Sequence, residues 1–143
     1  MRLLLLCAAL PALSWAATPS DTDHLASEAA SLIPPFQQQL LQTVQQAVAN
    51  GGPTAAVESC QVLAPQIADA HSKNQWRIGR TSLRLRNPAN QADAWERQVL
   101  EDFARRSKTG EPLAQMRQAA VVDGEFRYMQ AIATGEPCLA CHG

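Results

Sequence analysis

The chain has 143 residues, of which 12 are lysine or arginine and 13 are aspartate or glutamate, so its formal net charge is −1. This length supports one domain with a modest apolar core and is too short for two. The nearly balanced charge gives no support to a nucleic-acid-binding role or to strong attraction to a membrane surface.

The first sixteen residues have the layout of a secretory signal peptide. An apolar run from Leu3 to Leu13 follows a basic residue, and Ser14 and Ala16 are small residues just before a plausible cleavage point. The run is too short for a permanent membrane span. We therefore expect residues 1–16 to be removed on export to the periplasm, and residues 17–143 to form a single domain.

Residues 21–50 carry an apolar residue at every third or fourth position, which predicts one long amphipathic helix. The stripe consists of Leu25, Ala29, Leu32, Phe36, Leu40, Val44 and Val48. The Pro34-Pro35 pair interrupts the stripe and either kinks the helix or divides it. Because the phase is the same on both sides of the prolines, a kink is favoured. The helix is expected to end at residues 50–53, Asn-Gly-Gly-Pro.

A second helix is predicted from Thr54 to about Asn74. Its apolar face carries Val57, Cys60, Ala64, Ile67 and His71. In a regular helix Cys60 and His71 lie about 16 Å apart, at about 1.5 Å per residue, so the two cannot bind the same metal ion. A buried cysteine usually behaves as a small apolar side chain, and the spacing alone favours that role for Cys60. His71 suits the C-terminal end of a helix, where a cation is favoured.

The apolar period changes to two between Trp76 and Pro88, which predicts extended chain with a bulge near Gly79, where the phase shifts. One face of this stretch carries Arg77, Arg80, Arg84 and Arg86. Guanidinium groups bind carboxylates through paired, charge-assisted hydrogen bonds. The arginines are therefore candidates for anion binding, and a solvated strand face is the alternative.

A third helix is predicted over residues 91–108, and Gly110 and Pro112 end it. Its core face carries Trp95, Val99 and Phe103. After it, residues 113–122 and 125–133 are predicted to be two antiparallel strands joined at Asp123-Gly124, a strong hairpin signal. Met116 and Met129 could bind a metal, but apolar packing is favoured. Arg127, Glu125 and Tyr128 read as ordinary strand residues.

The C-terminal residues contain a Cys-x-x-Cys-His string, formed by Cys138, Cys141 and His142. Two thiols at this spacing can each add to a vinyl group of one porphyrin, and the adjacent imidazole can bind the iron. We therefore expect one covalent haem c, with Cys138 and Cys141 as thioethers and His142 as the proximal ligand. A redox cysteine pair or half of a zinc site is the alternative, although a second pair of zinc ligands is missing. The candidates to pair with the haem propionates are Arg77, Arg80, Arg84 and Arg86.

Four strings, in this order along the chain, resemble a family of exported haem-c domains. They are Cys60 with APQIA at 64–68, IGRTSLRLRNPAN at 78–90, DAWE at 93–96 and CLACHG at 138–143. The resemblance extends from Leu25 to Gly143. It implies an α+β, PAS-like fold in which long N-terminal helices pack on a small antiparallel sheet and the haem lies at the C-terminus. It also implies that Cys60 is the sixth iron ligand rather than a core residue.

The resemblance implies a module that senses redox state or a small ligand through its haem, and a soluble periplasmic electron-transfer cytochrome is the alternative. A carrier needs both axial positions filled by the protein, whereas a gas sensor needs an open site or a ligand that leaves. The sequence contains no nucleophile and base at a spacing typical of a catalytic site. It also lacks a distal His and Arg pair of the peroxidase kind, so no enzymatic activity is expected. Either function requires an unidentified redox or signalling protein as its partner.

Overall fold

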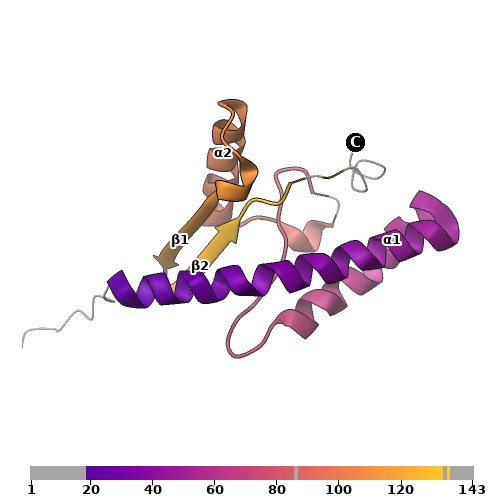
Figure 1. Cartoon of the computed structure of the whole chain (residues 1–143), viewed down its shortest axis with the longest axis horizontal. Coiled ribbons are helices and arrows are strands. Elements are labelled where there is room, and N and C mark those ends of the chain that lie inside the picture. Colours follow the sequence, from indigo (N-terminus) through magenta and orange to yellow (C-terminus); the bar gives the residue numbers. More distant parts are fainter. Residues whose placement is uncertain (1–18, 86, 134, 136–143) are drawn as a thin grey trace, which may run out of the picture.

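The computed structural model describes residues 19–85, 87–133 and 135, and it is built from two helices and a β-hairpin (Figure 1). The elements are α1 (Pro19–His71), α2 (Ala94–Lys108), β1 (Arg117–Val122) and β2 (Glu125–Gln130), with short 3-10 helices at Pro88–Asn90 and Leu113–Gln115. The combination of helices with a small two-stranded antiparallel sheet confirms the α+β class. The PAS-like arrangement stays a prediction.

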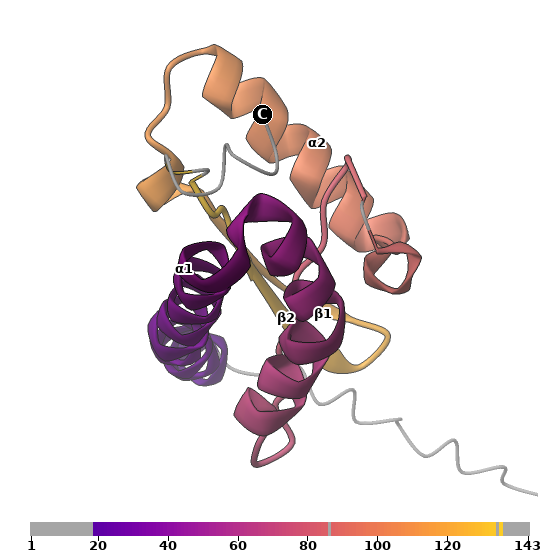
Figure 2. The same ribbon diagram turned by 90° about the vertical axis from the view of Figure 1, so that its right-hand side faces the viewer.

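Helix α1 runs through both prolines and then folds back on itself as a helical hairpin (Figure 2). The backbone dihedrals leave the helical region at Gly51 (φ −157°, ψ 15°) and Gly52 (φ 73°, ψ −171°), and not at Pro34 or Pro35. The prolines therefore do not divide the helix, and the glycines break it where the sequence predicts. We call residues 19–50 the first arm and residues 53–71 the second arm of α1. The second arm ends three residues earlier than predicted.

The two arms of α1 are joined by the first of two apolar clusters. Phe36 and Leu40 from the first arm pack with Ile67 from the second arm, and all three are less than a tenth exposed. Ala64, Ala68 and Ile78 cover the edge of this cluster. Phe36 and Leu40 belong to the predicted apolar stripe, so the stripe is the surface that one arm presents to the other.

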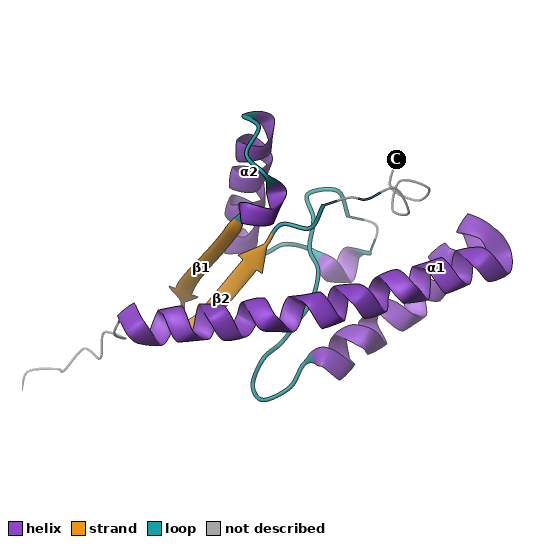
Figure 3. Ribbon diagram, viewed as in Figure 1, coloured by secondary structure: helices purple, strands orange, loops and turns teal. Residues whose placement is uncertain are grey.

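The stretch between Trp76 and Pro88 is irregular chain, so the predicted strand is wrong for its described residues (Figure 3). Among the residues that the structure describes, the sheet consists of β1 and β2, and no third strand accepts this stretch as a neighbour. Its backbone is held by side chains instead: the Ile78 amide donates to Ser72 Oγ at 3.1 Å, and Thr81 Oγ1 donates to the Asn90 carbonyl at 3.0 Å. Alternating apolar residues specify a strand only where a partner strand is available.

Helix α2 begins at Ala94, three residues later than predicted, because Asp93 caps it. The Asp93 carboxylate accepts from the Glu96 amide at 2.8 Å, and the Glu96 carboxylate accepts from the Asp93 amide at 3.0 Å. This reciprocal pair is a capping box, and it satisfies two amides that the first turn would leave without partners. The helix ends at Lys108, as predicted, and Gly110 follows with a φ of 89°.

The hairpin turns at Asp123 (φ 52°) and Gly124 (φ 84°), as the sequence predicts. Two successive positive φ angles match the twist of the flanking strands, which pair from Val122 with Glu125 to Arg117 with Gln130. Both strands are shorter than predicted. Pairing stops at Arg117 because the preceding residues form a 3-10 helix.

The second apolar cluster lies between α2 and the hairpin. It consists of Val99 and Phe103 from α2 and Met116 just before β1, with Met116 fully buried. Trp95, Leu113, Met129 and Ala131 cover its edge. The packing role expected of Met116 is confirmed, and its sulfur is enclosed by apolar side chains.

The strands lie between α2 and the first arm of α1 in both views (Figures 1 and 2). Contacts between α1 and β2 are consistent with this order. Among the described residues, no helix combines the length and the apolar character that crossing a membrane requires.

Candidate functional site

The predicted site residues divide into two groups. Cys138, Cys141, His142 and Arg86 lie outside the described residues, as does the predicted signal peptide. Cys60 and the other three arginines are described, and they lie on consecutive segments of the chain: the second arm of α1 and the irregular stretch after it. The described part of the site is therefore contributed by residues 60–84.

Cys60 lies on the second arm of α1 and is half-buried. One turn further on, Ala64 packs against the first apolar cluster, and Ile67 belongs to it. Ala64 and Ile67 of the predicted apolar face are therefore turned toward the first arm, and Cys60 lies one turn before Ala64. The arm is helical from residue 53 to residue 71, so the predicted separation of Cys60 from His71 holds and one metal ion cannot bind both.

His71 occupies the last turn of α1, as expected. Its Nε2 lies 2.7 Å from Gln39 Oε1 of the first arm, and its ring meets the Phe36 ring edge-on, with the centroids 5.7 Å apart. Both contacts tie the end of the second arm to the middle of the first. His71 therefore helps to close the helical hairpin.

The three described arginines of the predicted anion site point into solvent. Arg77, Arg80 and Arg84 are exposed, and none of their guanidinium groups pairs with a carboxylate anywhere in residues 19–85, 87–133 or 135. Leu83 and Leu85, which flank Arg84, are also exposed, at 45% and 41%. Because this stretch is not a strand, the arginines do not form the single strand face that the alternation predicts.

Arg127 has a structural role that the sequence did not indicate. Its Nη1 lies 2.6 Å from Asp93 Oδ2 and its Nη2 lies 3.2 Å from Glu96 Oε1, while its guanidinium carbon sits 4.7 Å from the centroid of the Trp95 ring. The same two carboxylates form the capping box of α2. One side chain of β2 is therefore attached to the first turn of α2 by two ion pairs and a cation–π contact.

The pKa of the Asp93 carboxyl is lowered from its ordinary value of 3.8. The largest cause is the hydrogen bond that it accepts from the Glu96 amide. Burial, the next largest, raises the pKa, and the hydrogen bond and charge of Arg127 lower it. The sequence signal that was available is the Asp93-x-x-Glu96 pattern of a capping box. The pairing with Arg127 depends on how the hairpin packs on α2.

The opposite side of β2 is held by Trp76. The Trp76 ring meets the Phe126 ring edge-on, with centroids 6.1 Å apart and planes at 89°, and its Nε1 donates to Glu28 Oε1 of α1 at 2.8 Å. Phe126 and Arg127 are neighbours, so their side chains leave opposite faces of the strand. Strand β2 is thus attached to α1 and to α2, and Cys138 follows its last residue by eight positions.

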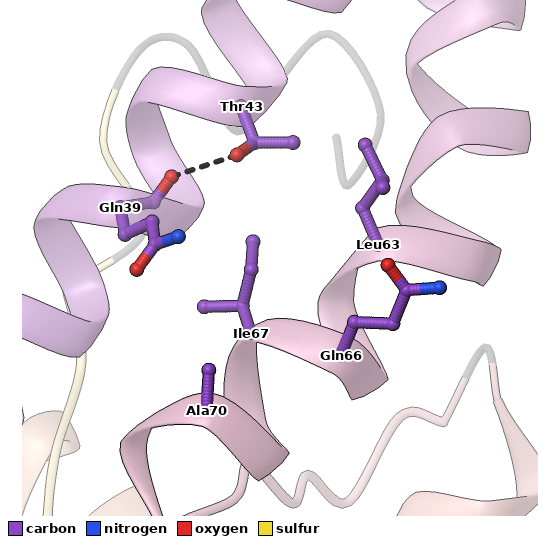
Figure 4. Close-up of a pocket in the computed structure, with 6 residues that line it drawn as sticks. All are labelled: Gln39, Thr43, Leu63, Gln66, Ile67 and Ala70. Atoms are coloured by element: carbon purple, nitrogen blue, oxygen red, sulfur yellow. Dashed lines mark hydrogen bonds between the residues drawn. The ribbon is translucent and has the colours of Figure 1, made fainter.

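A shallow hollow of about 240 Å³ lies between the two arms of α1 (Figure 4). Its lining residues are Gln39, Thr43, Leu63, Gln66, Ile67 and Ala70. These side chains offer amides, a hydroxyl and aliphatic groups, and Thr43 Oγ1 already donates to the Gln39 carbonyl at 2.9 Å. The hollow contains none of the predicted site residues. In the part of the chain that the structure describes, no three His, Cys, Asp or Glu residues gather into a metal-binding group.

Comparison with known proteins gives one positive finding. A family model described as Tll0287-like matches residues 19–143, which is most of the chain and includes the C-terminal Cys-x-x-Cys-His string. No curated protein and no solved structure matches.

Proposed function

Because the chain belongs to the Tll0287-like family, which is related to c-type haem, we propose that it is an exported protein carrying one covalently attached haem c. The observation that carries this proposal is that the family match runs through Cys138, Cys141 and His142. Two thiols three residues apart followed by an imidazole are the groups that covalent haem attachment requires. In this proposal residues 1–16 are a cleaved signal peptide and residues 17–143 act in the periplasm.

The chemistry of the described residues fits a haem group. A haem presents a broad apolar ring with two anionic propionates at one edge. Arg77, Arg80 and Arg84 are exposed cations with no carboxylate partner among the described residues, and Leu83 and Leu85 are exposed apolar side chains beside them. The residues that follow α1 therefore offer both kinds of group that the cofactor's periphery requires.

Each candidate residue has a separate role in this proposal. Cys138 and Cys141 form the thioethers, and His142 is the proximal ligand. One or two of the arginines, including Arg86, pair with the propionates. Bound haem would supply an iron that accepts and releases one electron.

Cys60 is proposed as the sixth ligand. Its position on the apolar face of the second arm, near Ala64 and Ile67, shields a thiol from disulfide exchange. A thiolate donates electron density strongly and favours ferric over ferrous iron, so Cys60 would hold the midpoint potential below that of a protein with His and Met ligands. A bond that weakens on reduction suits a module that senses redox state or a small ligand, within a PAS-like domain.

A soluble electron-transfer cytochrome is the second candidate. The exposed arginines favour it, because exposed charges that are not used inside the protein steer association with a partner of opposite charge. No enzymatic role is proposed. Carbon monoxide binding to the reduced protein separates the two functions, since a carrier keeps both axial positions filled and a sensor opens one.

Haem attachment is tested by extracting the denatured protein with acidified acetone. We expect the haem absorbance to stay with the protein, and to be lost from a variant with Cys138→Ser and Cys141→Ser. Absorbance that moves into the solvent from the unsubstituted protein would show that no thioether bonds exist.

Ligation by Cys60 is tested separately with Cys60→Ser. We expect the ferric spectrum to change from low-spin to high-spin and the midpoint potential to rise, while the haem remains attached. A Ser59→Ala variant, at the neighbouring helical position, is the control. An unchanged ferric spectrum in the Cys60 variant would show that Cys60 does not bind the iron and has a packing role.

A further inference from the structure

Charge is segregated along this chain. The 23 residues between Asp69 and Asp93 contain five basic residues and no acidic one. The five are Lys73, Arg77, Arg80, Arg84 and Arg86. The remainder of the chain has seven basic residues against thirteen acidic ones. The stretch that follows α1 is therefore strongly positive, and the rest of the protein is negative.

Three arginines in and after α2 are used in ion pairs of the fold, whereas the three described arginines of the stretch after α1 are not. Arg105, Arg106 and Arg127 each pair with a carboxylate of α2, of its N-cap or of the turn that follows it. Arg77, Arg80 and Arg84 are exposed and form no such pair within the described chain. Their charges are therefore exposed to solvent and form no ion pair that stabilises the described fold.

Two exposed leucines accompany these charges. Leu83 and Leu85, on either side of Arg84, are 45% and 41% exposed. The backbone that carries them is already ordered, because the Arg84 amide donates to Ser82 Oγ at 3.0 Å and Thr81 Oγ1 donates to the Asn90 carbonyl at 3.0 Å. An ordered segment loses less conformational entropy on binding than a flexible one.

We propose that Arg77, Arg80, Leu83, Arg84 and Leu85, together called the basic strip, dock a partner protein whose surface presents carboxylates around an apolar centre. Two haem propionates neutralise at most two of the five positive charges in residues 70–92, so at least three remain on the basic strip and beside it. Charged residues around a small apolar contact produce fast, short-lived association. This inference names a partner class for the proposed function, but its residues are described and its test does not require haem.

An anionic membrane fits the same residues less well. The basic strip is irregular chain rather than an amphipathic helix, and its two leucines are already more than half covered. Shallow membrane insertion requires a continuous apolar face. The excess of six acidic residues elsewhere in the chain would also be repelled by an anionic surface.

The experiment measures binding of the purified protein to an immobilised copolymer of glutamate and tyrosine, which supplies carboxylates with apolar groups among them. We expect the triple variant Arg77→Gln, Arg80→Gln, Arg84→Gln to bind about tenfold more weakly at an ionic strength of about 20 mM. The matched control is the triple variant Arg97→Gln, Lys108→Gln, Arg117→Gln, which removes the same charge from exposed residues elsewhere. Its affinity is expected to change by less than about twofold.

Two further arms complete the test. Leu83→Ser with Leu85→Ser is expected to weaken binding to the copolymer and to leave binding to pure polyglutamate unchanged. Equal weakening in the two triple variants, or no effect of the leucine pair on copolymer binding, would overturn the proposal. So would tighter, strip-dependent binding to vesicles of phosphatidylserine and phosphatidylcholine than to the copolymer. Haem retention is measured on each variant by solvent extraction, so failure of docking and failure of haem attachment are read separately.

Discussion

The two apolar clusters are built in different ways. The first, Phe36 with Leu40 and Ile67, joins the two arms of a single helix that reverses at Gly51-Gly52. The second, Val99 with Phe103 and Met116, joins α2 to the hairpin. Two ion-paired arginines contact its rings: Arg106 lies over Phe103 and Arg127 over Trp95.

The ion pairs that the described residues make with one another all lie in the region of the second cluster, so charge contributes to stability there more than in the helical hairpin. Arg127 binds the carboxylates at the start of α2, and Arg106 near its end binds Glu111 and Asp102. The Arg106 guanidinium lowers the pKa of the Glu111 carboxyl, and Glu111 with Asp102 raises the pKa of Arg106. The helical hairpin depends on packing and backbone geometry, whereas the region of α2 also depends on ionisation. Variants in each region should therefore respond to different conditions.

The largest effect is expected at the centre of the second cluster. Met116→Ala removes a fully buried side chain, so the free energy of unfolding should fall by about 3 kcal/mol. Leu40→Ala is the counterpart in the helical hairpin and should cost about 2 kcal/mol, because Leu40 is slightly exposed. Urea denaturation of both variants measures the two losses. A loss for Met116→Ala no greater than that for Met129→Ala, at the edge of the cluster, would contradict this account of the core.

The reversal of α1 is the next most sensitive position. Gly52 has φ 73° and ψ −171°, a combination that residues with a side chain very rarely adopt. We therefore expect Gly52→Ala to destabilise the protein by about 2 kcal/mol. Gly79→Ala is the control, because an added Cβ there meets no atom within 4 Å and the φ angle is not positive. Equal melting temperatures for the two variants would show that the glycine turn does not determine the helical hairpin.

A smaller loss is expected when Arg127 is removed. Arg127→Met keeps an apolar stem but loses the ion pairs to Asp93 and Glu96 and the contact with Trp95, which should cost about 1 kcal/mol. Arg97→Met, an exposed change on α2, the helix to which Arg127 is attached, should be nearly neutral. Chemical denaturation at low salt and at high salt measures both variants. An Arg127 effect that does not diminish with salt would assign the loss to packing rather than to charge.

The smallest effect concerns pH. Because the folded-state pKa of Asp93 is below its ordinary value of 3.8, the stabilisation by its ionised form is fully present above that value and is lost as pH falls through the lower folded pKa. Asp93→Asn keeps a capping side chain but removes the charge. The difference in melting temperature between the protein and this variant should shrink between pH 7 and pH 3. A difference that stays constant over this range would exclude ionisation of Asp93 as its cause.

The local elements were predictable because their signals lie within a few residues. The reversal at Gly51-Gly52, the capping residues of α2 and the turn at Asp123-Gly124 all depend on backbone preferences of the residues concerned. Three residues at the C-terminus predicted the cofactor, and the family match supports that prediction. The apolar stripe of the first arm predicted which of its faces is buried.

The strand predicted between Trp76 and Pro88, which the structure does not contain in its described residues, shows that a local pattern alone does not predict a strand. Leu83 and Leu85 alternate with arginines as a half-buried strand would, but both are exposed in irregular chain. A strand requires backbone partners from another part of the chain, and nothing within residues 76–88 specifies whether these exist. The arginines consequently point into solvent instead of forming one face.

The sequence by itself determined the helices, the hairpin and the Cys-x-x-Cys-His string, because each depends on neighbours along the chain. Only the tertiary structure decided that β2 is attached on both sides, through Trp76 to Glu28, 48 residues away from it, and through Arg127 to the cap of α2. These contacts join distant residues, and the shape of the packed elements determines which of them meet. Periodicity records which face of an element is apolar, whereas the choice of partner for that face depends on how the whole chain folds.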